Sequence, residues 1–266
     1  MNKVKLSVSI VAACAIALGG GAAIHQAISP YTIYDNLNFK MPTMLASNYE
    51  LFGDFDCVYL SDNVSFDDGN MVLTIDKNTN PDYVSSHSGA EYMSRSTYGY
   101  GYYEVSMIPI KNDGVCSSFF TYAGNDDNTS ISEIDIEFLG NDPTVVSFNY
   151  FVNGESFGAY SYPLGFDATE DFHKYGFLWQ ADAITWFVDD IPVYRVTRNQ
   201  GQIPTVESKI IMNVWTGSDE VVDWIGKYDE TSPLSARYDY FSYTEIDKVS
   251  ERMYKLIDAY LPSNIN

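Results

Sequence analysis

Short runs with strand character follow one another along most of this chain. They are separated by turn residues, and no helical periodicity interrupts them between Cys57 and about Thr244. Strands spaced in this way predict an all-β sandwich or barrel rather than alternating strands and helices. The predicted strands include Met71–Asp76, Gly89–Ser96, Tyr100–Ile110, Cys116–Tyr122, Glu133–Leu139, Val145–Phe151, Lys174–Trp179, Ile184–Val188, Pro192–Thr197, Lys209–Trp215 and Arg237–Tyr243.

The β-rich region is expected to form one domain, because no repeat or low-complexity linker divides it. A chain of 266 residues also has the usual size of one β-sandwich. We place this domain at residues 51–245, after an irregular extension at 28–50. Within the domain, Asp189-Asp190 predicts a tight hairpin between two apolar runs.

The last segment, residues 246–266, changes character. Apolar residues follow helical spacing there, which predicts an amphipathic helix that either docks on the domain or binds a partner. The residues of this apolar face are Met253, Leu256, Ile257, Tyr260 and Leu261.

Residues 1–27 have the pattern of an export leader. Lys3 and Lys5 precede an apolar run from Leu6 to Leu18, and Ala23 or Ala27 is a suitable cleavage point. We therefore expect a secreted, extracellular protein. The alternatives are a buried N-terminal helix, an uncleaved membrane anchor, or a lipoprotein attached through Cys14, which follows a short Val-Ala-Ala box.

Without the leader, two cysteines remain, Cys57 and Cys116. Export would permit a disulfide between them, but their spacing does not require one, and two unpaired small apolar residues fit equally well. The chain has three histidines and no paired Cys/His spacing, so the sequence predicts no zinc site.

The formal net charge of −21 limits the partners of this chain. Nucleic acids and anionic membrane surfaces attract Lys/Arg-rich faces, so neither is expected to bind. A neutral ligand fits best, and the 22 tyrosines, 15 phenylalanines and 4 tryptophans supply side chains that stack on flat sugar faces. We expect the protein to be a monomer.

One predicted strand carries a row of carboxylates. Glu133, Asp135 and Glu137 alternate with Ile134, Ile136 and Phe138, so the acidic residues share one face of the strand. Neighbouring carboxylates would lie roughly 6–7 Å apart. Their repulsion raises the pKa of one carboxyl while another stays ionised, and glycoside hydrolysis needs that combination.

The acidic row can also arise without any role in catalysis. In a chain with 36 acidic residues, composition alone can produce a solvated acidic face. A calcium-binding cluster is the second alternative, although no EF-hand loop pattern is present.

Several ordered blocks make the chain resemble the bacterial lichenases of glycoside hydrolase family 16, the β-1,3-1,4-glucanases. The likeness covers about residues 50–245, and Glu133–Gly140 matches the catalytic motif. The other blocks are Thr97–Gly101, Tyr103–Val105, Ser117–Tyr122, Phe148–Tyr150, Asn153-Gly154, Leu164–Asp167, Phe172-His173, Tyr175–Phe177, Trp179-Gln180, Met212-Asn213, Trp215, Asp223-Trp224 and Gly226.

The resemblance implies a β-jelly-roll sandwich with a concave cleft for an extended glucan and a retaining double displacement. In that mechanism Glu133 matches the nucleophile, Asp135 the assisting carboxylate and Glu137 the general acid/base. On a flat strand the Cα atoms of Glu133 and Glu137 would be roughly 13 Å apart. Retention needs carboxyl groups about 5–5.5 Å apart, so strand curvature and leaning side chains would have to close the gap.

Further residues carry over from the same resemblance. Positions that line the family's cleft are matched by Glu91, Asn149, Asn213, Trp215 and Trp224. Ordinary core packing accounts equally well for each tryptophan. Asp239 matches a calcium ligand on the opposite side of the sheet, which implies a structural ion and no cofactor for catalysis.

The sequence also departs from the family. Ile131-Ser132 stands where lichenases have Trp-Asp, Met93 replaces an Arg, and Phe151 replaces a Tyr. Cys57 matches a disulfide cysteine, but the partner region around Tyr83–His87 contains no Cys. The missing Trp, Arg and Tyr affect expected sugar contacts and linkage preference rather than the carboxylates.

The expected function is therefore a secreted endo-β-glucanase, a licheninase acting on mixed-linkage glucan. A β-1,3-glucanase or a glucan transglycosylase of the same family is the alternative within the class. A carbohydrate-binding jelly roll without catalysis is the alternative outside it, and the presence of both Glu133 and Glu137 argues against that alternative. No Gly-x-Ser-x-Gly elbow or Cys–His pair supports another hydrolase class.

Overall fold

The computed structural model describes residues 32–124 and 131–261. The predicted leader, with Cys14, lies outside the described residues. Within the described ranges, no helix has the length and apolar character needed to cross a bilayer.

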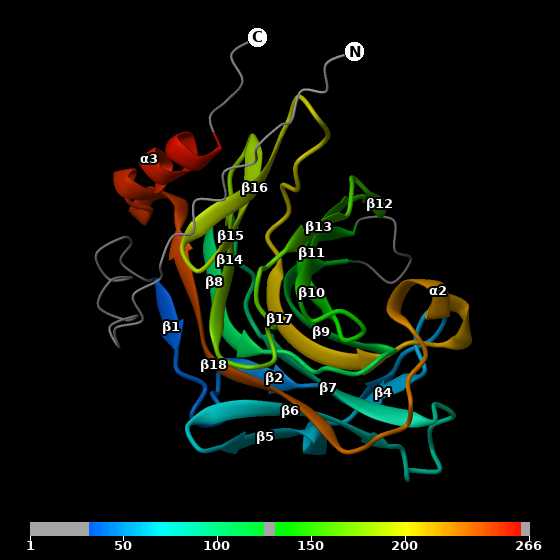
Figure 1. The fold of residues 1–266 in the computed structure, drawn as a ribbon. Helices are drawn as coiled ribbons and strands as arrows, with labels where there is room; N and C mark the ends of the chain where they lie inside the picture. The colour runs from blue at the N-terminus through cyan, green and yellow to red at the C-terminus, as the bar shows by residue number, and fades with distance from the viewer. Residues whose placement is uncertain (1–31, 125–130, 262–266) are drawn as a thin grey trace, which may run out of the picture.

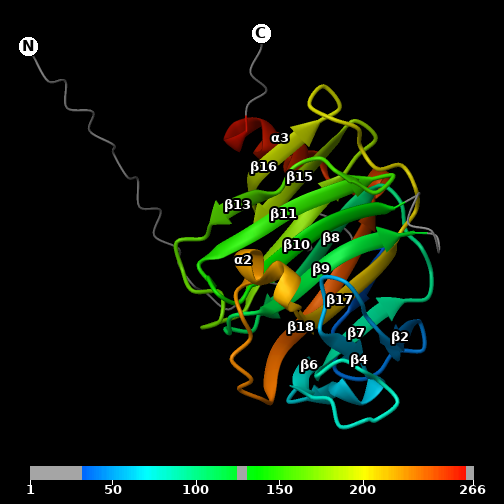
Figure 2. The same cartoon turned by 90° about the vertical axis from the view of Figure 1, so that its right-hand side faces the viewer.

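Two curved antiparallel layers pack face to face (Figure 1). The layer that carries the acidic strand has the order β13, β11, β10, β9, β17, β7, β2, and Figure 2 shows it face on. Its strands are β13 (Tyr160–Pro163), β11 (Val145–Val152), β10 (Ser132–Leu139), β9 (Val115–Ala123), β17 (Lys209–Thr216), β7 (His87–Ser94) and β2 (Met44–Ala46).

The second layer has the order β16, β15, β14, β8, β18, β6, β5, with β1 added to β18. Its strands are β16 (Ile191–Thr197), β15 (Ala183–Val188), β14 (His173–Trp179), β8 (Gly101–Ile108), β18 (Leu234–Glu245), β6 (Asn70–Lys77), β5 (Val64–Asp67) and β1 (Ile33–Asp35). The predicted all-β sandwich is confirmed.

Short elements complete the domain. They are β3 (Tyr49–Glu50), β4 (Cys57–Tyr59) and β12 (Glu155–Ser156), the 3-10 turns Ser61–Asn63, Asp219–Val221 and Ile246–Lys248, and the helix α2 (Val222–Ile225). The expectation that no helix interrupts the strands is therefore wrong at α2, since four residues are too few to show a helical period. The strands β1, β2 and β3 likewise fall in the extension that was expected to be irregular.

The Asp189-Asp190 turn is confirmed as the hairpin between β15 and β16. Both aspartates have positive φ, 48° and 68°. A two-residue turn with positive φ at both positions matches the right-handed twist of the flanking strands.

Aromatic and aliphatic side chains from both layers form the core. Ile134 and Ile136 of β10 are fully buried there. Phe148 of β11 stacks on Trp186 of β15, with ring centroids 5.6 Å apart. Since one face of β10 packs into this core, its acidic face points out of the sandwich.

The predicted C-terminal helix is present as α3 (Glu251–Tyr260). Met253 and Ile257 are buried against Leu178 and Phe187 of the second layer, so the helix docks on its own domain. Tyr260, which was expected on the apolar face, is 54% exposed because it lies at the end of the helix.

Both described cysteines, Cys57 and Cys116, are free and buried. Cys57 is paired in register with His87, and its sulfur faces Gly89, where a Cβ would lie 2.7 Å from Sγ. Cys57 thus packs against a glycine, as a small apolar residue would.

Candidate active site

The three carboxylates of β10 line one cavity of about 560 Å³. Register with the neighbouring strands keeps their side chains on this face: Glu133 lies opposite Tyr122 of β9, and Glu137 lies opposite Ser118. The alternation predicted for Glu133–Leu139 therefore puts acids in the cavity and apolar residues in the core.

Burial dominates the electrostatics of the carboxylates. Loss of water raises the pKa of Glu137 to about 7. The pKa of Asp135 is raised well above its usual range, first by burial and then by the charges of Glu133 and Glu137. The pKa of Glu133 is raised to about 8 by burial and by the charge of Glu137, and a hydrogen bond with Asp135 opposes the rise.

The hydrogen bond between Asp135 and Glu133 shows which of these two carboxyl groups carries a proton. A hydrogen bond between two carboxyl groups needs one proton, and it raises the pKa of Asp135 while lowering that of Glu133. Asp135 is therefore the donor and Glu133 the acceptor. This bond favours the Glu133 anion, against the burial that raises the pKa of this carboxyl to about 8. Burial raises the pKa of Glu137 to about 7, so both glutamates hold a proton at mildly acidic pH.

Glu91 lies on β7 and lines the same cavity. Its side chain is almost fully buried, and each carboxylate oxygen already accepts a hydrogen bond. Ser47 donates to Oε1 at 2.6 Å, and Tyr49 donates to Oε2 at 3.0 Å. Burial raises the pKa of Glu91, while these two bonds and the charge of Lys209 oppose the rise.

Asn213 and Trp215, both on β17, also line the cavity. The amide of Asn213 donates to the Tyr59 hydroxyl at 2.9 Å and accepts a short hydrogen bond from Ser118. Trp215 packs edge-on against Phe55, with ring centroids 4.6 Å apart. Trp215 is therefore both a packed residue and a wall of the cavity.

The other two predicted cleft residues, Asn149 and Trp224, are not among the residues that line the cavity. Asn149 is opposite Asp135 on β11, and its side chain accepts hydrogen bonds from Ser156 and from the Tyr150 amide. Trp224 lies on α2, is 46% exposed and packs 6.1 Å from the Trp215 ring. Neither lines the cavity, so their contacts with sugar stay predictions.

Several cavity residues were not named as site residues from the sequence. They are Tyr49, Leu51, Phe55, Tyr59, Ser118, Phe120, Tyr122 and Lys209. Strand alternation through β9 would have found Ser118, Phe120 and Tyr122, since Phe119 between them is buried in the core. No local pattern marks Tyr49 or Phe55, which reach the cavity from the N-terminal part of the domain.

The residues that depart from the family pattern lie in three different places. Met93 lines it, with its sulfur 3.5 Å from Nζ of Lys209. Phe151 lies opposite Glu133 on β11, so it presents a ring without a hydroxyl there. Ile131 and Ser132 line a separate hollow of about 260 Å³.

Asp239 lies on β18, the strand of the other layer, where the register shifts between Tyr238 and Tyr240. Burial raises the pKa of this carboxyl, and a hydrogen bond with Ser106 opposes the rise. Calcium takes six to eight oxygen ligands. Among the described residues, no three His, Cys, Asp or Glu side chains gather as a metal set. Main-chain carbonyls and water would have to complete a site at Asp239, and calcium stays a prediction.

Comparison with known proteins agrees with this geometry. The family described as "Glycosyl hydrolases family 16" matches residues 52–236. A β-glucanase of Acetivibrio thermocellus is 48% identical over 189 residues, which cover 71% of this chain and 55% of that protein. The chain thus spans about half the length of that relative.

Two further relatives are matched over nearly their full length. A β-glucanase of Bacillus licheniformis is 42% identical over 241 residues, covering 90% of this chain and 93% of that one. A β-1,3-1,4-glucanase (lichenase) derived from a mouse hindgut metagenome has a solved structure with a TM-score of 0.76. It is 40% identical, and the match covers 80% of this chain and 99% of that one.

The expected jelly-roll sandwich is confirmed by the layers described above and by the likeness to the lichenase structure. The acidic row of β10 falls inside the residues that the family matches. By fold, by sequence and by the position of its carboxylates, this chain belongs to glycoside hydrolase family 16.

Proposed function

We propose that this chain is an endo-β-glucanase that hydrolyses mixed-linkage β-1,3-1,4-glucan. One observation carries the proposal: three carboxylates share one face of β10 and line a cavity with aromatic walls. Such a cavity suits a neutral polysaccharide, because rings stack on sugar faces and the carboxylates provide acid, base and nucleophile. The names of the relatives, β-glucanase and lichenase, support this substrate class.

In the proposed reaction Glu133 is the nucleophile. The hydrogen bond from Asp135 favours its ionised form, which would attack the anomeric carbon and form a covalent glycosyl-enzyme. Asp135 would assist by holding the Glu133 carboxylate in place and by sharing its proton.

Glu137 would supply the acid and then the base. With a pKa near 7 it keeps a proton at mildly acidic pH, and it would donate that proton to the leaving oxygen. In the second step the Glu137 carboxylate would take a proton from water, and that water would release the sugar with its anomeric configuration retained.

A reducing-end assay tests the proposal. Purified residues 28–266 would be incubated with mixed-linkage glucan, β-1,3-glucan and cellulose, beside Glu133→Gln as a matched control. We expect new reducing ends from the mixed-linkage polymer. In the variant we expect the rate to fall by at least about 1,000-fold, on the order of what removing a covalent nucleophile costs.

The alternatives give different results in the same assay. If new reducing ends appear mainly with β-1,3-glucan, the substrate is that polymer rather than mixed-linkage glucan. Transfer products without new reducing ends would indicate a transglycosylase. Binding of glucan without either product would indicate a carbohydrate-binding protein without catalysis and would contradict the proposal.

The place of action is part of the proposal. The leader-like pattern of residues 1–27 supports export, with a membrane or Cys14 lipid anchor as the alternative. We also propose that the protein acts as a monomer. Sequencing of the mature N-terminus and light scattering of the purified protein test the two statements separately.

A further inference from the structure

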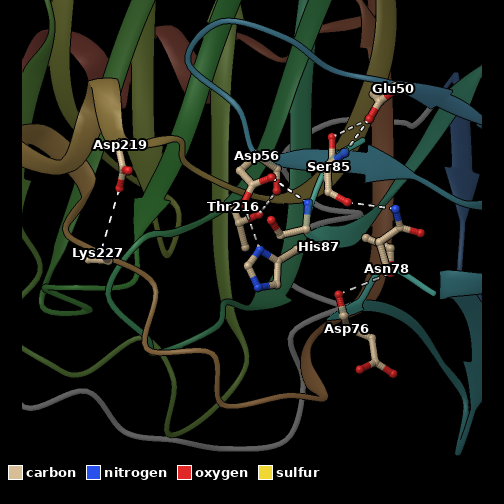
Figure 3. A network of polar contacts seen from close by, with 11 residues as sticks. Glu50, Asp56, Asp76, Asn78, Ser85, His87, Thr216, Asp219 and Lys227 are labelled. Atoms are coloured by element: carbon tan, nitrogen blue, oxygen red, sulfur yellow. Dashed lines mark hydrogen bonds and ion pairs between the residues drawn. The ribbon is translucent and has the colours of Figure 1, made fainter. Parts of the chain in front are cut away.

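One wall of the cavity is made by a short segment, residues 49–57, which we name the cleft strap. Tyr49, Leu51 and Phe55 of this segment line the cavity. Two acidic residues of the same segment, Glu50 and Asp56, instead hydrogen-bond residues 84–87, which we name the clasp loop (Figure 3).

Glu50 makes the first set of contacts with the clasp loop. Its Oε1 accepts from the Val84 amide at 2.7 Å, from the Ser85 amide at 2.6 Å and from the Ser85 hydroxyl at 2.8 Å. Hydrogen bonds to an ionised carboxylate are stronger than neutral ones, and these lower the pKa of Glu50. Figure 3 shows Glu50 and Ser85 side by side at one end of the network.

Asp56 makes the second set. Its Oδ1 accepts from the Ser86 amide at 2.7 Å, and its Oδ2 lies 3.3 Å from Nδ1 of His87. The main chain of Asp56 is bound as well, since its amide donates to the Thr216 carbonyl and its carbonyl accepts from the Thr216 hydroxyl. Asp56 therefore connects the cleft strap both to the clasp loop and to β17.

In the first half of the cleft strap Tyr49 packs edge-on against Tyr59 and Leu51 is partly buried, but the residues that follow are exposed. Phe52 is 70% exposed, and residues 53 and 54 are exposed too. The strand β3 has only two residues, which pair with β4. A segment of this kind depends on its polar contacts for a fixed position, and Glu50 supplies three of them.

The second half of the cleft strap has further main-chain contacts. The Ser218 amide donates to the Asp54 carbonyl at 2.9 Å, and Phe55 forms an isolated β-bridge with Gly217. Cys57, at the end of the strap, is free, so no disulfide among the described residues joins the strap to its neighbours. Loss of the Glu50 carboxylate should therefore loosen the strap more than loss of the Asp56 carboxylate.

We propose that Glu50 and Asp56 are positioning residues, which fasten the cleft strap to the clasp loop and so fix one wall of the cleft. The inference rests on the proposed function, because it concerns how the glucan is held. The carboxylates of β10 lie on a different strand, so loosening the strap would weaken glucan binding and leave the chemical step largely intact.

Two substitutions of Glu50 test the proposal. Glu50→Ala removes all three hydrogen bonds. Glu50→Gln keeps a side-chain oxygen that accepts from the same two amides. We expect a roughly tenfold higher KM for mixed-linkage glucan in Glu50→Ala, with kcat changed less than twofold, and recovery of most of the loss in Glu50→Gln. Glu251→Ala, an exposed acidic residue of α3, is the matched control.

A binding measurement separates this inference from the proposed function. In the Glu133→Gln background, a mixed-linkage tetrasaccharide would be titrated by calorimetry with and without Glu50→Ala. Hydrogen exchange of the Val84 and Ser85 amides would be followed in the same proteins. We expect weaker binding by about tenfold and faster exchange of both amides in Glu50→Ala.

The outcomes are distinct. If the tetrasaccharide fails to bind the Glu133→Gln protein in which Glu50 is unchanged, the proposed function is contradicted, and this inference is contradicted with it. If it binds and Glu50→Ala leaves the affinity unchanged, the inference alone is overturned. An equal loss of kcat and affinity in Glu50→Ala and Glu50→Gln also contradicts a positioning role.

Discussion

The carboxyl groups of Asp135 and Glu133 are hydrogen-bonded to each other on the open face of β10. With the proton on Asp135, the bond stabilises the Glu133 anion. We expect Asp135→Ala to lower kcat by about 10–100-fold, the contribution of one hydrogen bond to a charged group.

Asp135→Asn is the matched variant, because an amide still donates a hydrogen bond to Glu133 without a titrating proton. It should lose less activity than Asp135→Ala at the pH optimum. Equal losses in the two variants, measured by initial rates across pH, would show that the hydrogen bond is not what Asp135 contributes.

Removing the charge of Glu137 should stabilise the fold. The pKa of this carboxyl is raised from 4.5 to about 7, so its stabilising contribution is complete below pH 4.5 and is lost as the pH rises through 7. Glu137→Gln does not titrate. We expect it to be more stable than the parent by about 1–3 kcal/mol at pH 8 and nearly equal at pH 4.

Urea unfolding at the two pH values measures this difference. Glu170→Gln, an exposed acidic residue, serves as the control and should show little change at either pH. A Glu137→Gln variant that is less stable than its parent at pH 8 would contradict the buried charge described here.

The C-terminal helix should contribute to stability through its buried side chains. Ile257 is 1% exposed and packs on the second layer, so Ile257→Ala should cost about 2–4 kcal/mol. Tyr260→Ala, three residues further along the same helix, should cost less than about 0.5 kcal/mol. Thermal unfolding of both variants would show whether the helix is held by its buried face.

A reducing agent should leave the melting temperature of residues 28–266 unchanged. Cys57 and Cys116 are both free and buried, so there is no described disulfide for the reductant to open. Calorimetry with and without dithiothreitol measures this. A drop of several degrees would mean that the two thiols pair in solution.

If Asp239 is a calcium ligand, main-chain oxygens and water must supply most of the other ligands, and the bound ion should stabilise the fold. A chelator is then expected to lower the melting temperature of the parent and to have no effect on Asp239→Asn. The same shift in both proteins would place the calcium site elsewhere, and no shift in either would remove the predicted ion.

The strand period alone predicted which side chains of β10 share one face, whereas their catalytic roles came from the family resemblance and stay predictions. Alternation from Glu133 to Leu139 fixes which side chains face out, and β10 has the expected bounds to within one residue. The same reasoning applied to β9 gives Ser118 and Phe120 as neighbours of the acidic row.

The partners of Glu91 could not be predicted in this way. Ser47 and Tyr49 lie 44 and 42 residues away in the chain, in a region without clear periodicity. Long-range contacts of this kind depend on how loops cross the sandwich, which no local spacing records. Glu91 lines the cavity as the resemblance implied, and its contact with a sugar hydroxyl stays a prediction.

The alternation of acidic and apolar residues along β10 limits how this protein can change over evolutionary time. One residue inserted or deleted within β10 would, from that point along the strand, turn carboxylates into the core and apolar residues such as Ile134 and Ile136 into the cleft. Core packing and the acidic row would be lost together. Descendants that keep the fold or the carboxylates must therefore keep the length of this strand. Variation in substrate preference is therefore expected to accumulate in the segments bordering the strand, where insertions leave the frame of β10 untouched.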